Sequence, residues 1–146
     1  NLVWYSHLMK LFKTLLTILF ISLLSSPSWS VTGDDLVYRN DLYYEKFTNV
    51  PFSGEVTGQE QGSFKNGKRD GAWVFYYQNG QLWYEGNYKN GKEEGAFISY
   101  SEYGQLSSKG NYKNGKREGY WFTRSNEGTV YKPMTGTFKD GVKISD

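Results

Sequence analysis

Three near-identical stretches decide the fold of this chain. They are Gly62–Gly71 (GSFKNGKRDG), Gly86–Gly95 (GNYKNGKEEG) and Gly110–Gly119 (GNYKNGKREG), and they recur every 24 residues. A partial fourth copy, Gly136–Gly141 (GTFKDG), follows the third after 26 residues. A fixed period of this length indicates a tandem array in which each repeat is one supersecondary unit.

Each repeat is predicted to be a β-hairpin. The β-prone run 72–77 (AWVFYY) ends before Asn79-Gly80, and the return strand 82–89 ends at Asn90-Gly91. Asn-Gly between apolar runs favours a type I′ turn, because such a turn needs two positive φ angles. No sustained helical period follows residue 30. The predicted fold is therefore all-β: an antiparallel meander of 24-residue hairpins that forms an elongated, twisted or curled sheet.

The domain organisation follows from the repeat. Residues 31–61 are expected to form an N-terminal β-hairpin that caps the array, and residues 62–146 form the repeats. The expected units are 62–85, 86–109, 110–135 and the partial copy 136–146.

Positions that keep their character in every copy are predicted to form the core, since stacked repeats bury equivalent side chains. Neighbouring strand residues point to opposite faces, so a core on both sides requires a strongly curled or covered sheet. The predicted ladders are Trp73, Phe97 and Trp121; Val74, Ile98 and Phe122; Leu82, Leu106 and Val130; and Phe64, Tyr88, Tyr112 and Phe138. Gly62, Gly86, Gly110 and Gly136 are each expected to lie under an aromatic ring of the next strand.

The first thirty residues resemble a secretory leader. The order is basic 9–13 (MKLFK), apolar 14–24 (TLLTILFISLL) and small residues up to Ser30, with residues 1–8 as an upstream extension. This order is typical of a signal peptide, and the apolar run is shorter than the roughly 20 residues of a membrane-spanning helix. Cleavage after Ser30 would give a periplasmic or secreted protein, whereas an uncleaved leader would anchor it.

Composition excludes most catalytic chemistry downstream of the leader. The chain has no Cys, and its one His is His7, so thiol nucleophiles and imidazole bases are absent from residues 31–146. Basic and acidic residues balance there, which argues against a global field for nucleic acid. We therefore predict no catalytic, cofactor-binding or metal-binding residues, and no enzyme activity.

Four aromatic residues in the first repeat are candidate partner-binding residues. They are Phe75, Tyr77, Trp83 and Tyr84. The second repeat has serine at all four positions, so the repeating fold does not require rings there. Two interpretations remain open. The rings pack against the N-terminal hairpin, or they form an exposed contact patch of the kind found at binding hot spots.

The Lys-Asn-Gly-Lys turns are predicted to form a basic rim along one edge of the sheet. Its candidate residues are Lys65, Lys68, Arg69, Lys113, Lys116 and Arg117. Such a rim either keeps the protein soluble and protects its turns, or it faces an anionic partner.

The repeats resemble the bacterial variant of the MORN repeat. The resemblance rests on the pattern Gly-x-Tyr-Lys-Asn-Gly-Lys-x-x-Gly-x-Trp and extends over residues 36–141, with departures at Arg124 and Pro133. It implies an irregular third unit and a non-enzymatic protein-interaction module, in its most concrete form an antitoxin or immunity protein that binds a toxin. The alternative is an envelope or surface module that binds glycan or anionic lipid through aromatic and basic surfaces.

Overall fold

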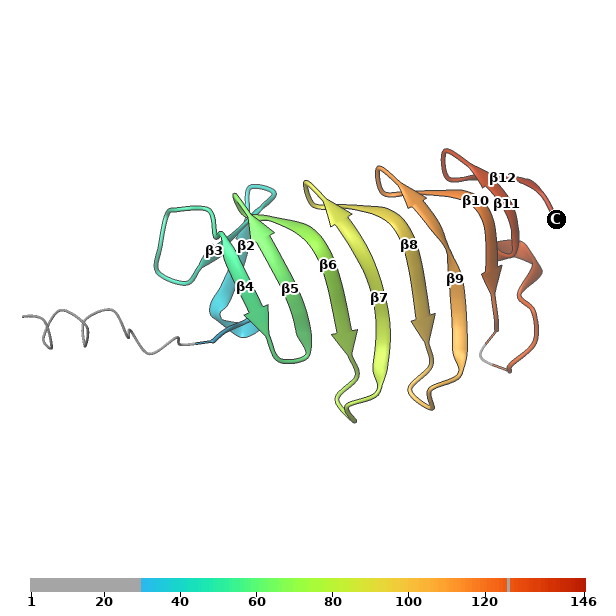
Figure 1. Cartoon of the computed structure of the whole chain (residues 1–146), viewed down its shortest axis with the longest axis horizontal. Coiled ribbons are helices and arrows are strands. Elements are labelled where there is room, and N and C mark those ends of the chain that lie inside the picture. The colour runs from blue at the N-terminus through green and yellow to red at the C-terminus, as the bar shows by residue number, and fades with distance from the viewer. Residues whose placement is uncertain (1–29, 126) are drawn as a thin grey trace, which may run out of the picture.

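The computed structural model describes residues 30–125 and 127–146, so the predicted leader lies outside the described residues. The chain forms one long row of strands (Figure 1). The strands of the row are β1 (Val31–Thr32), β4 (Gly54–Thr57), β5 (Glu60–Lys65), β6 (Lys68–Tyr76), β7 (Leu82–Lys89), β8 (Lys92–Tyr100), β9 (Leu106–Lys113), β10 (Lys116–Thr123), β11 (Gly136–Lys139) and β12 (Val142–Ser145). The predicted all-β meander is confirmed.

The sheet is open and mostly antiparallel. From β4 to β12 every strand pairs with the strand before it in the row, and only β1 runs parallel to its neighbour β4. A separate hairpin, β2 (Leu36–Arg39) and β3 (Leu42–Glu45), lies at the N-terminal end of the row. Two short 3₁₀ helices, Gly33–Asp35 and Lys132–Met134, complete the described structure.

The predicted type I′ turns form one edge of the sheet, which we call the turn edge. In its four tight turns, at residues 66–67, 90–91, 114–115 and 140–141, the first residue has φ between 50° and 52° and the glycine has φ between 74° and 84°. Asparagine, aspartate and glycine tolerate these angles, which explains why the motif recurs.

The opposite edge, the loop edge, is built from wider loops, and here the expectation of a type I′ turn at Asn79-Gly80 is wrong. Gly80 has φ of 82°, whereas Asn79 is not among the residues with positive φ. The Tyr77 N–H donates to the Gln81 carbonyl at 2.8 Å, and the Gly80 N–H donates to the Tyr77 carbonyl at 2.9 Å. Equivalent bonds recur 24 residues later, from Ser101 to Gln105 and from Gly104 to Ser101.

The core of this single-layer sheet is formed by aromatic rings that lie across glycines of the neighbouring strand. The rings of Trp73 and Trp121 lie over Gly62 and Gly110 of the preceding strands, and the exposed fractions of the two tryptophans are 1% and 0%. Phe97 lies over Gly86 in the same way. Register shifts occur at this level in β5–β6, β7–β8 and β9–β10, and such bulges bend strands. We call the side of the rings the inner face.

The row of inner-face rings runs the length of the array. Neighbouring rings from Tyr43 to Trp121 have centroids 4.1–6.2 Å apart, the range in which aromatic pairs attract. At its N-terminal end, buried Leu36, Val56 and Phe64 join Trp73 in one cluster. The expected capping segment therefore shares a core with the first repeat.

The other two predicted ladders are less buried than expected. Val74, Ile98 and Phe122 are only partly buried on the outer face, which is the side opposite the inner face. In the third ladder Leu82 and Leu106 are partly buried, and Val130 is 52% exposed. Because consecutive strand residues alternate between faces, the bend encloses the side that carries Trp73 and leaves the side of Val74 open. An apolar or aromatic residue that recurs in each repeat therefore predicts burial on the inner face, but not on the outer face.

The third repeat is irregular, as the resemblance implied. Val130 forms an isolated bridge with Arg124 in place of a return strand. Pro133 then lies in the 3₁₀ helix Lys132–Met134, and β11 pairs with β10. The fourth predicted contact differs too, because a Cβ on Gly136 would meet the Ser145 backbone and Lys143, not a ring.

The ring-over-glycine contact predicts unequal effects of one substitution in two repeats. Gly110→Ala would place its Cβ in steric clash with the Trp121 indole, whereas the Cβ of Gly86→Ala would lie 3.2 Å from Phe97. Overpacking of a rigid core costs about 1–3 kcal/mol. We expect Gly110→Ala to lower the free energy of unfolding by at least about 1 kcal/mol more than Gly86→Ala, measured by denaturant melting. Equal losses would contradict the assigned core.

Candidate functional site

Phe75 and Tyr84 belong to the core of the N-terminal half. They face each other across β6 and β7 with ring centroids 4.1 Å apart and planes at 21°. Phe75 is 7% exposed and lies in the cluster with Leu36 and Val56, against which Tyr84 packs. Burial raises the pKa of the Tyr84 hydroxyl well above its usual value. For this pair the structure places the rings in the packing role.

Trp83 and Tyr77 reach the surface at the loop edge. Trp83 is 46% exposed, and its ring centroid lies 5.6 Å from that of Tyr77. The Tyr77 hydroxyl donates a hydrogen bond of 2.9 Å to the Tyr100 carbonyl of the next repeat. Burial raises the pKa of Tyr77, and the negative charge of Glu102 adds to the shift. Tyr77 is thus a fixed, neutral side chain beside an exposed indole.

Tyr103 is a surface residue that the comparison of strand positions did not identify. It lies in the loop between β8 and β9 and is 83% exposed. Asn79 occupies the same position in the first repeat. A tyrosine at a position that holds a turn residue in the first repeat is the sequence signal that could have identified it. Tyr77 and Tyr103 line the same hollow at the loop edge. We call Tyr77, Trp83 and Tyr103 the loop-edge surface.

In the second repeat a buried polar contact replaces the Phe75–Tyr84 pair. Ser99 and Ser108 occupy the corresponding strand positions and face each other across β8 and β9. Their hydroxyl oxygens lie 2.8 Å apart, and both residues are 9% exposed. The sheet therefore accepts either rings or paired hydroxyls at this level, as long as the polar groups are satisfied.

The two arginines of the predicted basic rim, Arg69 and Arg117, lie over rings of the inner face and do not add exposed charge to the turn edge. The guanidinium carbon of Arg69 lies 4.8 Å from the Trp73 ring centroid, and Arg69 pairs with Glu60 at 2.8 Å. The guanidinium carbon of Arg117 lies 4.4 Å from the Trp121 ring centroid. These cations lie over rings of the inner face, where cation–π attraction stabilises them.

The exposed charge at the turn edge therefore comes from lysines. Lys65 faces Lys68 directly across one turn, and Lys113 faces Lys116 across another. All four are exposed. Lys89 and Lys92 form a third such pair between them.

The acidic residue of each turn motif stabilises the next turn. The Asn90 N–H donates to the Asp70 carboxylate at 3.4 Å, and the Asn114 N–H donates to the Glu94 carboxylate at 2.8 Å. The Asp140 N–H donates to Glu118 at 3.0 Å. These carboxylates connect repeats and have a structural role.

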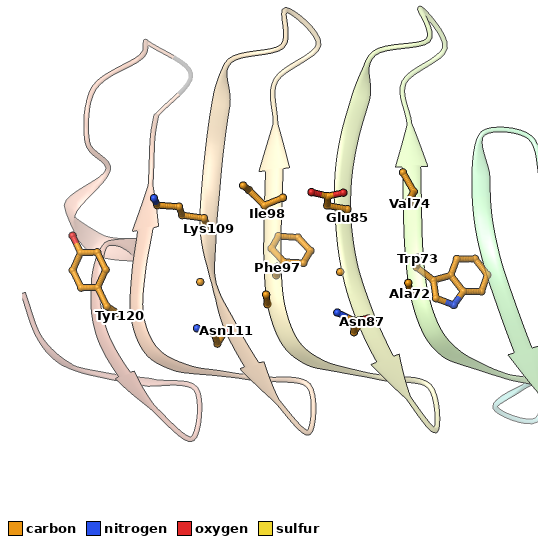
Figure 2. Close-up of a pocket in the computed structure, with 13 residues that line it drawn as sticks. Ala72, Trp73, Val74, Glu85, Asn87, Phe97, Ile98, Lys109, Asn111 and Tyr120 are labelled. Atoms are coloured by element: carbon orange, nitrogen blue, oxygen red, sulfur yellow. The ribbon is translucent and has the colours of Figure 1, made fainter.

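The outer face carries an open groove of about 570 Å³ that crosses β6 to β10 (Figure 2). Its floor is backbone at Gly86 and Gly110, because Trp73 and Phe97, which pair with these glycines across the strands, point to the inner face. The bordering side chains are Ala72, Val74, Glu85, Asn87, Ala96, Ile98, Lys109, Asn111 and Tyr120. The charged side chains among these are one carboxylate, Glu85 on β7, and one amine, Lys109 on β9.

Within residues 30–125 and 127–146, no group of three or more His, Cys, Asp or Glu side chains could hold a metal ion. No helix among those residues has the length and apolar character needed to cross a membrane.

The aromatic candidates predict a clear separation of stability from surface. Phe75→Ser and Trp83→Ser both copy the second repeat, which has Ser99 and Ser107 there. Phe75→Ser should cost about 3–5 kcal/mol, because a buried ring is lost. Trp83→Ser should change the free energy of unfolding by less than about 1 kcal/mol. Denaturant melting checks both, and similar losses would assign Trp83 to the packing role.

The lysines predict little effect on stability. Like charges that face each other across a strand pair repel, so replacing Lys65, Lys68, Lys113 and Lys116 together by Gln should leave the free energy of unfolding within about 1 kcal/mol of the parent. Thermal melting at low and high salt measures this. A large loss at low salt would show that these lysines hold the turn edge together.

The comparison with known protein families matches the repeat geometry. The family model described as MORN repeat variant matches residues 69–90 and 93–114, one match per 24-residue period. The matched part is narrower than residues 36–141, over which the sequence pattern extends. No curated protein matches the chain. Residues 69–114 therefore carry two tandem repeats of the MORN repeat variant family.

Proposed function

We propose that this protein is a non-enzymatic module that binds another protein through the loop-edge surface. The observation that carries the proposal is the exposure of Trp83 and Tyr103, at 46% and 83%. Ser107 and Asn79 replace them in the neighbouring repeats, so the fold requires neither ring. Tryptophan and tyrosine are enriched among the residues that contribute most to protein–protein affinity.

Contacts between neighbouring loops hold this surface in one arrangement. The Tyr77 hydroxyl is bonded to the Tyr100 carbonyl, and the Asn79 amide donates to the Glu102 carbonyl at 3.0 Å. Both bonds join the first repeat to the second. A surface that is ordered before binding loses less conformational entropy in the complex, which supports a role in recognition.

The place of action and the class of partner form the finer part of the proposal. The leader predicted over residues 1–30 supports action in the periplasm or outside the cell. The resemblance to the MORN repeat variant supports an antitoxin or immunity role, in which the partner is a toxin. Such a toxin would have to meet the protein after export.

Site-specific cross-linking in the producing bacterium tests the proposal. The full chain, with its leader, is made with a photo-reactive phenylalanine analogue at position 103 or at position 120. Tyr120 is a matched control, since it is an exposed tyrosine (59%) that lines the outer-face groove. We expect one protein to cross-link at position 103 and not at position 120. Trp83→Ser should weaken the binding of that protein by more than about 2 kcal/mol.

Other outcomes would contradict the proposal. Equal cross-linking at both positions would show that the contact is not specific to the loop edge. Retention on polysaccharide or on anionic lipid vesicles that depends on Tyr103, with no protein cross-linked, would favour the envelope-binding alternative.

A further inference from the structure

A hollow of about 540 Å³ lies at the loop edge, next to the loop-edge surface, with which it shares Tyr77 and Tyr103. Three repeats contribute to its walls. Besides the two tyrosines, its polar side chains come from Ser101, Glu102, Gln105, Ser107, Arg124 and Ser125. The side chain that sets its chemistry is Arg124.

Arg124 departs from the repeat at its own position. The first and second repeats have Tyr76 and Tyr100 there, so the array does not need a cation at this level. The Arg124 Nε is buried and has no hydrogen-bond partner. Among the described residues, no carboxylate lies within ion-pair distance of the Arg124 guanidinium, in contrast to Arg69 with Glu60. The Nε of Arg69 is enclosed by protein in the same way, so the Arg124 donors that can meet a ligand in the hollow are the two terminal nitrogens of the guanidinium.

The groups around Arg124 restrict the acceptor. The Ser101 oxygen accepts from the Tyr103 and Gln105 N–H groups, both at 3.3 Å, which leaves its own O–H free to donate outward. Glu102 also lines the hollow. Its negative charge opposes a doubly charged anion about twice as strongly as a singly charged one, so the hollow favours a single negative charge. A guanidinium presents parallel N–H donors that match the two oxygens of a carboxylate.

We propose that this hollow is a carboxylate-binding pocket in which Arg124 is the principal donor. The pocket takes either an acidic side chain of the protein that docks on the loop-edge surface or a free carboxylic acid. The first source rests on the proposed function, whereas the binding chemistry does not.

The pocket is tested without any partner by nuclear magnetic resonance. The isotope-labelled full chain is titrated with sodium acetate, with sodium chloride at equal ionic strength as the reference. We expect saturable shifts of the Arg124 Nε–H and of the Ser107 and Ser125 amides with acetate alone. Inorganic phosphate above its second pKa should bind at least tenfold more weakly than acetate.

Two variants connect the signal to the guanidinium. Arg124→Tyr copies Tyr76 and Tyr100, so it should fold, which its amide spectrum will confirm, and it should lose the acetate response. Arg124→Lys keeps the charge but not the paired donors, and it should weaken acetate binding at least tenfold. Equal shifts with chloride and acetate, or an unchanged response in Arg124→Tyr, would overturn the proposal.

Blocked peptides and the cross-linked partner distinguish the two sources. N-acetylated, C-amidated Ala-Glu-Ala should compete with acetate, and the matched Ala-Gln-Ala should not. If Arg124→Tyr also weakens the partner at least tenfold, the carboxylate belongs to that protein. If acetate binds while the affinity of the partner is unchanged, the source is a free acid. If acetate binds and no protein cross-links at position 103, the pocket stands and the proposed function fails.

Discussion

The contact between an aromatic ring and a glycine of the preceding strand is the constraint on which this structure depends. A single-layer sheet has no second layer to cover its apolar side chains, so the tryptophans must be buried by their own sheet. Trp121 achieves this by lying flat over Gly110, with its indole N–H donating to the Asn111 carbonyl at 2.9 Å. Each strand is therefore stabilised by its neighbour, and the array gains stability from nearest-neighbour contacts.

This architecture separates positions that build the sheet from positions that are free to bind. The inner face and the turn edge carry contacts that recur in the first three repeats, such as Trp73 over Gly62 and the Asn114 N–H on Glu94. The loop edge differs from repeat to repeat, and this is where Trp83, Tyr103 and Arg124 lie. Loops on a rigid scaffold commonly carry function, and here the internal repeat itself shows which side chains the scaffold does not need.

Much of the fold could be predicted from the 24-residue period and the Asn-Gly turns, because both report on local backbone geometry. Asn79-Gly80 looked the same in sequence, yet it lies in a wider loop, since the register of β6 and β7 decides the turn. The positions of Phe75 and Arg69 depend on neighbours that are distant in sequence: Leu36 and Val56 bury the first, and Glu60 pairs with the second. The hollow around Arg124 joins three repeats, so no single repeat could reveal it.

The carboxylates of the turn edge also distinguish the fourth copy of the motif from the first three. Asp70, Glu94 and Glu118 each receive the first N–H of the following turn. In the fourth copy the corresponding residue is Ile144, which is 61% exposed on β12. Another hairpin of the same kind would meet a hydrocarbon side chain where its turn needs an acceptor. A hairpin placed against β12 would therefore lack the turn contact that joins the earlier repeats, and it would meet the exposed side chains of Val142 and Ile144 instead.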